Sequence, residues 1–135
     1  MKGFLSKVLA FFAIAVLLTA FNPQNAGAAA HILWHTEHIY LDSPGEATVV
    51  GYFENDGDGA GTVSWMEFDL TFTADNGQQM WADTGIRHYP DGIEVWPGNY
   101  VEYTFYINNP NIPEYHGKYR WRTTNNRTHW QNAVG

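Results

Sequence analysis

Apolar and polar residues alternate along most of the chain after residue 30, and this alternation predicts strands. In residues 62–73 (TVSWMEFDLTFT), every second residue from Met66 onward is apolar, and the residues between them are polar or charged. A period of two is typical of a strand with one buried face and one wet face. The same alternation recurs in three further segments, at residues 46–54, 99–108 and 118–124. It predicts that Phe68 and Phe105 point into a core.

Residues that favour turns separate these runs. The acidic, glycine-rich segment 55–61 (NDGDGAG) and Asn76-Gly77 suit hairpin connections. Residues 83–98 are expected to be irregular apart from an optional short strand at residues 93–96. Asn125-Asn126 is expected to turn the chain into a last short segment near residues 128–134. With an opening strand at residues 31–41, the elements recur about every 8–12 residues. The pattern predicts an all-β domain, an antiparallel Ig-like β-sandwich of about seven strands.

The first thirty residues read as a secretory signal peptide. A short basic start precedes an apolar run at residues 8–21, which is shorter than the roughly twenty residues of a membrane span. Two small-x-small sequences follow, Ala26-Gly27-Ala28 and Ala28-Ala29-Ala30, and both suit a signal peptidase. We therefore expect a mature N-terminus between Ala29 and His31 and no membrane span after cleavage. The expected location is secreted or extracytoplasmic, in the periplasm or at the cell surface.

Residues 31–135 have the size of one small domain. The chain has no cysteine, so the fold must rest on its apolar core without disulfides. This part carries five Lys and Arg against fourteen Asp and Glu, a net charge of −9. An acidic surface repels phosphate groups, which argues against nucleic acid and anionic lipid as partners.

Several short motifs together resemble small exported bacterial Ig-like modules of the FxLYD and SLAP kind. The motifs are Val49-x-Gly51-x-Phe53-x-Asn55, Asp69-Leu70-Thr71-Phe72, Gly77, Pro97-Gly98 and Tyr103-x-Phe105. The resemblance covers residues 47–107 and implies a β-sandwich that works outside the cytoplasm. The ligands of most such modules are unknown, so the resemblance implies almost nothing about chemistry. The chain departs from the pattern in its aromatic opening strand and in Arg120-Trp121-Arg122.

Tryptophans outside the expected core are candidate binding residues. A domain of this size cannot easily bury all six of its tryptophans, and exposed Trp side chains are typical of binding patches. The alternation places Trp65 on the polar face of its strand, and Trp96 and Trp130 have no clear core position. Flat aromatic side chains of this kind suit sugar rings or the side chains of a protein partner.

A stripe of cations is the second candidate binding feature. Lys118, Arg120 and Arg122 alternate with aromatic residues, so the three cations share one strand face. Like charges on one face repel each other unless acids lie across from them. We expect these cations to form a cross-strand ladder of ion pairs with a neighbouring strand. The candidates are the strands that carry an outward Glu37, Glu67, Asp69 or Glu102. The alternative is a free stripe that docks on an acidic partner or on a second copy.

Two groups of residues are candidate metal ligands. His31 and His35 share one strand face, and imidazoles suit Zn²⁺ or Cu²⁺. Three acids spaced two apart imitate the start of a Ca²⁺ loop: Glu54, Asp56 and Asp58. The glutamate that closes an EF-hand loop is missing, because Trp65 holds that position. We expect surface histidines, a solvated loop and no cofactor; weak Ca²⁺ binding by the loop is the alternative.

Catalytic motifs are sparse. Glu67 and Asp69 share a strand face about 7 Å apart, but an exposed acidic face explains this pair as well as glycoside hydrolysis does. The chain has no Gly-x-Ser-x-Gly and no cysteine nucleophile. We therefore expect a non-enzymatic interaction module that assembles with a protein component of the cell envelope. The alternative is a carbohydrate-binding module with exposed Trp platforms, and self-association is compatible with the first function.

Overall fold

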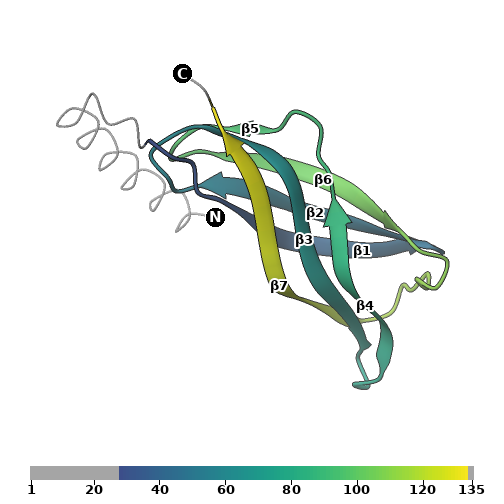
Figure 1. Ribbon diagram of the computed structural model, residues 1–135. Helices are drawn as coiled ribbons and strands as arrows, with labels where there is room; N and C mark the ends of the chain where they lie inside the picture. The colour runs from purple at the N-terminus through teal and green to yellow at the C-terminus, as the bar shows by residue number, and fades with distance from the viewer. Residues whose placement is uncertain (1–27, 134–135) are drawn as a thin grey trace.

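The computed structural model describes residues 28–133, which form seven β-strands and no helix (Figure 1). The strands are β1 (Ile32–Ser43), β2 (Glu46–Asn55), β3 (Gly61–Ala74), β4 (Gln79–His88), β5 (Glu94–Val95), β6 (Tyr100–Asn108) and β7 (Tyr119–Asn132). The predicted all-β fold is confirmed. The expected signal peptide lies outside the described residues over positions 1–27. The described residues contain no helix that is long and apolar enough to cross a membrane.

The strands form two antiparallel sheets, so the predicted β-sandwich is also confirmed. The first sheet has the order β1-β2-β6. In the second sheet, β3 is central: β7 pairs with one edge over its whole length, and β4 and β5 share the other edge. Figure 1 shows β7, β3 and β4 in front of the first sheet. The outer face of the second sheet therefore faces the viewer.

The core lies between the sheets and is built from the alternating apolar residues. Phe68 is fully buried and Phe105 is 3% exposed, which confirms the predicted inward register of both strands. Trp34 packs against Phe53 and Phe105, with ring centroids 4.8 and 5.7 Å apart. Because each large aromatic side chain buries about 150–250 Å², these rings supply a core that needs no disulfide.

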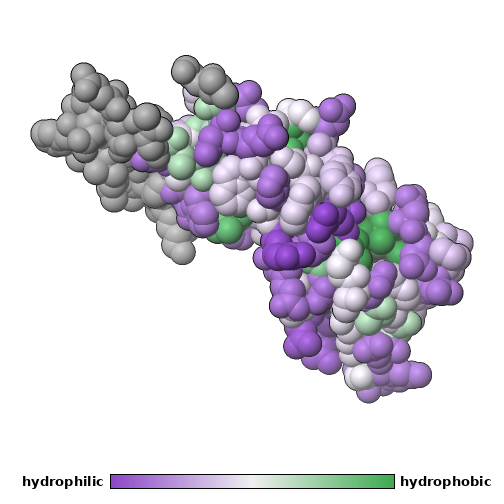
Figure 2. All heavy atoms as spheres, in the orientation of Figure 1, coloured by the Kyte–Doolittle hydropathy of each residue, from purple (hydrophilic) through white to green (hydrophobic). Residues whose placement is uncertain are grey.

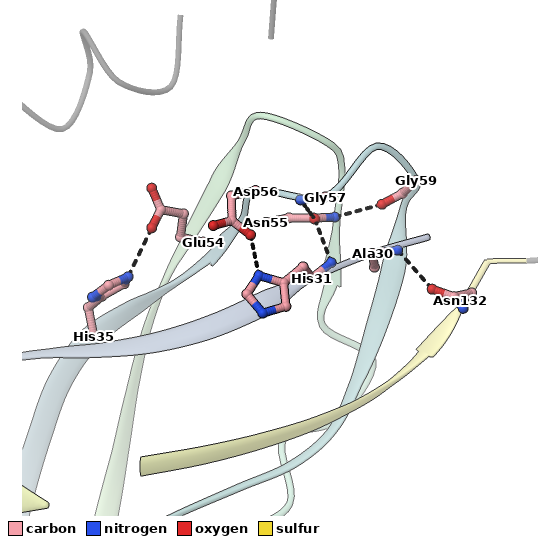
Figure 3. Close-up of polar contacts among 9 residues, drawn as sticks. All are labelled: Ala30, His31, His35, Glu54, Asn55, Asp56, Gly57, Gly59 and Asn132. Atoms are coloured by element: carbon pink, nitrogen blue, oxygen red, sulfur yellow. Dashed lines mark hydrogen bonds and ion pairs between the residues drawn. The ribbon is translucent and has the colours of Figure 1, made fainter. Parts of the chain in front are cut away.

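Asn55, at the end of β2, is fully buried and joins three parts of the chain. Figure 3 shows its hydrogen bonds to His31 and to the β2–β3 loop. Its Nδ2 donates to the carbonyl oxygens of Gly59 and Val95, both at 2.9 Å. Its Oδ1 accepts from the backbone N–H groups of His31 (3.1 Å) and Gly57 (2.9 Å). These four hydrogen bonds compensate for burying the amide. They fix the β2–β3 loop to the start of β1 and to β5.

Two bulges in the second sheet correct the expected element boundaries. The expectation that residues 83–98 are irregular is wrong for 83–88, which continue β4. The turn expected at Asn125-Asn126 is also wrong, because β7 runs through both residues. Gly85 (φ 63°) and Asn125 (φ 53°) take the left-handed conformation, where each strand has one extra residue opposite β3. A bulge absorbs such a residue without ending the strand.

Candidate functional site: the basic face of the second sheet

Every Lys and Arg within residues 28–133 lies on β4, on β7 or at the position just before β7. These cations are Arg87, Lys118, Arg120, Arg122 and Arg127. All five are exposed, and those of β7 alternate with half-buried residues that pack on the core. We call the outer side of β4, β3 and β7 the basic face. Figure 2 shows strongly hydrophilic side chains gathered over the middle of β3 and β7 on this side.

The bulge in β7 keeps the cations on one face. Before Asn125 the odd-numbered residues Tyr119 and Trp121 point inward, and after Asn126 the even-numbered Trp130 does so. One extra residue in a strand reverses the side to which later residues point. Arg127 therefore shares the outer side with the cations that precede the bulge.

Glu67 is the centre of one half of the basic face. Arg87 Nε donates to Oε1 of Glu67 (3.0 Å), and Arg127 Nε donates to Oε2 (3.1 Å). The hydrogen bond from Arg127 lowers the pKa of the Glu67 carboxyl most, and the bond from Arg87 lowers it further. Desolvation acts in the opposite direction and raises this pKa. Two cations thus share one carboxylate.

The ring of Trp65 is covered by neighbouring side chains. His129 on β7 stacks parallel to it with ring centroids 5.4 Å apart. The guanidinium of Arg87, on β4, lies 3.8 Å from the centre of the ring. Because β7 and β4 flank β3 on opposite sides, both flanks of the indole are occupied. Trp65 therefore anchors the arginines by a cation–π contact and does not offer a free flat surface to a sugar.

Asp69 lies between the two bulges and bonds to each. Its Oδ1 accepts from the backbone N–H of Gly85 (2.8 Å), and its Oδ2 accepts from Nδ2 of Asn125 (2.7 Å). These bonds, with the one from Asn125 the stronger, lower the pKa of the Asp69 carboxyl. The carboxylate is thus occupied in holding the two left-handed residues, and it forms no ion pair with a described residue.

The other half of the basic face has no acidic partner. Strand β7 does lie beside β3, which carries Glu67 and Asp69, but Arg120 lies opposite Thr73 and Arg122 opposite Thr71. The expected ladder is therefore wrong in its register. Lys118, Arg120 and Arg122 make no ion pair with any residue of the described range. Thr71, Thr73, Arg120, Trp121 and Arg122 line an open hollow of about 440 Å³.

The outer face of the first sheet has the opposite charge. Strands β1, β2 and β6 contain no Lys or Arg. Four carboxylates stand on their outer side: Glu37, Glu46, Glu54 and Glu102. The pKa of Tyr52 is raised, first by burial and then by the negative charges of Glu54 and Glu37. Two exposed tyrosines, Tyr40 and Tyr106, lie opposite the same residue of β2. We call this surface the acidic face.

The remaining candidate tryptophans differ in exposure. Trp96, just after β5, is 60% exposed. Trp130 is half-buried against the core and meets the ring of His31 edge to face at 5.8 Å. Trp96 is therefore the one of the three proposed platforms, within the described part of the chain, whose indole is largely free.

The candidate metal ligands each have a partner within the chain (Figure 3). Nδ1 of His31 contacts the carboxylate of Asp56, and Nε2 of His35 lies 3.0 Å from Oε1 of Glu54. Oδ1 of Asp58 accepts from the backbone N–H of Ala29 (2.8 Å). Among residues 28–133, no three His, Cys, Asp or Glu side chains gather in a metal-binding group. The expectation of no cofactor, with weak Ca²⁺ binding by the loop as its alternative, stays a prediction.

The residues that sequence reasoning missed are Arg87, Arg127 and His129. Arg87 falls in a segment expected to be irregular, and Arg127 next to an expected turn. Asparagine and glycine signal a turn and a bulge alike, since both need a left-handed residue. The alternation on either side of residues 84–85 and 125–126, with its reversed phase, is the signal that could have revealed the bulges.

Comparison with known proteins adds little. No protein-family model matches the chain, and no curated protein matches it, so the resemblance to FxLYD and SLAP modules stays a prediction. A solved structure, that of Spo0M, a sporulation control protein from Bacillus subtilis, matches with 14% sequence identity and a TM-score of 0.38. The match covers 77% of this chain and 48% of the other, so the chain spans about half the length of that protein. A likeness this weak carries no argument about function.

Proposed function

We propose that this protein is an exported, non-enzymatic module that assembles through its basic face with an acidic protein surface in the cell envelope. The observation that supports the proposal is the segregation of charge. Every Lys and Arg of the described residues lies on the second sheet or just before β7, and Lys118, Arg120 and Arg122 form no ion pair within that range. A net charge of −9 makes unpaired cations on one face a specific feature rather than a property of the whole surface.

The chemistry of the stripe suits carboxylates. Arg120 and Arg122 extend from the same side of a strand, about 7 Å apart along it. A guanidinium binds a carboxylate with two parallel hydrogen bonds. Thr71 and Thr73 line the same hollow as the two arginines. The strand backbone is already ordered, so docking would cost little entropy there.

The partner we favour is the acidic face of a second copy. Glu37, Glu46, Glu54 and Glu102 form a surface of opposite charge, with Tyr40 and Tyr106 as exposed aromatic contacts. Contact between two different faces of the same molecule is heterologous, so it leaves one of each face free and can grow into a chain.

Two complementary variants test this partner. Sedimentation velocity at low salt should detect association of the wild type that high salt weakens. Arg120→Gln with Arg122→Gln, and separately Glu54→Gln with Glu102→Gln, should each weaken it about tenfold or more. A mixture of the two variants should form dimers that cannot grow, because each variant keeps the face that the other lacks.

The control changes charge away from both faces. Asp91→Asn removes a carboxylate from the loop before β5 and should leave association unchanged. A wild type that stays monomeric at about 100 μM and low salt would refute the second copy as partner. Equal weakening by the control would show that net charge, and not the faces, is responsible.

A carbohydrate-binding module is the second candidate, and the exposure of Trp96 is the observation that favours it. A sugar that stacks on this indole should change the intrinsic Trp fluorescence and appear as a hit on a glycan array. Trp96→Ala should abolish both signals. No change in fluorescence with any arrayed glycan would eliminate this candidate.

A further inference from the structure

The segment before β1 is held against the β2–β3 loop by main-chain hydrogen bonds. The carbonyl oxygen of Ala29 accepts from the N–H groups of Asp58 (3.0 Å) and Gly59 (3.1 Å). The carbonyl oxygen of His31 accepts from the N–H of Asp56 (3.0 Å). Residues 29–31 therefore belong to the folded domain.

Two glycines of the loop give this segment its room. A Cβ at Gly57 would lie 2.3 Å from the carbonyl oxygen of Ala29, and one at Gly59 would lie 2.8 Å from the carbonyl carbon of Ala28. No side chain fits at either position unless the backbone moves. The alternation of Asp and Gly in residues 56–59 is thus explained by close contact with residues 28–31.

The surroundings of Ala30 distinguish between the two cleavage sites that the sequence allows, after Ala28 and after Ala30. It is 6% exposed within the core, and its N–H donates to Oδ1 of Asn132 at 2.8 Å (Figure 3). Cleavage after Ala30 would remove this buried methyl group, this hydrogen bond and both bonds to the carbonyl of Ala29. Cleavage after Ala28 would keep all of them.

We propose that signal peptidase cleaves after Ala28 and that the Asp58 carboxylate then holds the new N-terminus. Hydrolysis breaks the Ala28–Ala29 peptide bond; water supplies the hydroxyl of the Ala28 carboxyl and a proton to the nitrogen of Ala29. That nitrogen already lies 2.8 Å from Oδ1 of Asp58. As an ammonium group it converts a hydrogen bond into an ion pair. The proposal rests on the export part of the proposed function and not on docking.

The acidic loop then binds the mature N-terminus. Asp58 binds the α-ammonium group, Asp56 contacts the imidazole of His31, and Asn55 binds the N–H of His31. This arrangement gives the loop acids a role that needs no metal. It also couples processing to the fold, because the ion pair exists only after the signal peptide has been removed.

The first test is the N-terminal residue of the exported protein. The full chain is expressed in a bacterial host, and the product is purified from the extracytoplasmic fraction and measured by mass spectrometry. We expect the mass of residues 29–135. Any other first residue, including an intact Met1, overturns the proposal. A protein that begins at Ala29 but stays monomeric refutes only docking to a second copy.

The second test removes the charge of the ammonium group and keeps its position. Lys118 is the single lysine after residue 28, and an α-amine with an ordinary pKa of about 7.7–8.0 reacts with acetic anhydride at neutral pH far faster than lysine. Acetylation should raise the unfolding equilibrium constant about two- to fivefold, as expected for an exposed ion pair.

The variant Asp58→Asn should abolish this effect of acetylation. Asp75→Asn, in the turn between β3 and β4, is the matched control and should preserve it. Equal urea midpoints before and after acetylation of the wild type would overturn the ion pair. An acetylation effect that persists in Asp58→Asn would do the same.

Discussion

Asn55 should be the most sensitive polar residue of the domain. Substitution by Ala removes four hydrogen bonds. Each of them contributes about 0.5–1.5 kcal/mol. The expected loss is about 2–6 kcal/mol, a large share of the roughly 5–15 kcal/mol that stabilises a domain of this size.

Urea unfolding followed by Trp fluorescence measures this loss. With a slope of about 1.5–2 kcal/mol/M for a domain of this size, the midpoint of Asn55→Ala should fall by about 1–4 M. The matched control is Asn76→Ala, since Oδ1 of Asn76 accepts from the N–H of Gln78 in an exposed turn. That variant should lose less than about 1 kcal/mol. A loss below about 1 kcal/mol in Asn55→Ala would refute the role of Asn55 as a joint.

Asn55→Asp is a more specific test, because it replaces the side-chain NH₂ group by an oxygen and hardly changes the volume. The carboxylate keeps an acceptor for His31 and Gly57 but sets a second oxygen against the carbonyl oxygens of Gly59 and Val95. Burial raises the pKa of such a carboxyl in the folded state. Its protonated form is therefore the compatible one, and the destabilisation should be largest at neutral pH and shrink as the pH falls below about 5. A pH-independent loss would contradict this reading.

Three further predictions follow from the core and the second sheet. Phe68→Ala and Phe105→Ala should each cost about 3–5 kcal/mol in urea unfolding, because each leaves a cavity; losses below about 1 kcal/mol at both sites would contradict the inward register. Burial lowers the pKa of His88, so the wild type should lose stability as the pH falls below about 6.5, and His88→Gln should flatten that dependence. Asp69→Ala should lower the melting temperature and speed hydrogen exchange at the N–H of Gly85; unchanged exchange would separate Asp69 from the bulge.

The inward and outward positions could be predicted from the sequence wherever a strand is regular. Alternation is a local property, so it identified Phe68, Phe105 and the inward Tyr119 and Trp121 without knowledge of partners. Turn-forming residues identified the hairpin at Asn76-Gly77, where the structure has a turn. The all-β class follows from these local patterns alone.

The charge pairs could not be predicted, because they depend on register between strands. Knowing that β7 carries cations and β3 carries acids does not say which residues face each other. In the observed register, Glu67 lies opposite Arg127 and Thr71 lies opposite Arg122. A register shifted by four residues would have set Arg120 opposite Asp69 and Arg122 opposite Glu67, which is the expected ladder, with the same sequence. The role of Asn55 was equally hidden, since its four partners come from four separate positions in the chain.

The two bulges connect the fold with the proposed function. Without the extra residue at Asn125, alternation would carry through β7 unchanged, and Arg127 would point into the core while Trp130 pointed outward. The bulge thus buries an indole and exposes a guanidinium in one step. It also brings Arg127 beside Glu67, so this carboxylate is already paired. Arg120 and Arg122 form no ion pair with a residue of the range 28–133, and this is the feature on which the proposed docking rests. A single carboxylate, that of Asp69, holds the bulge on each side of β3.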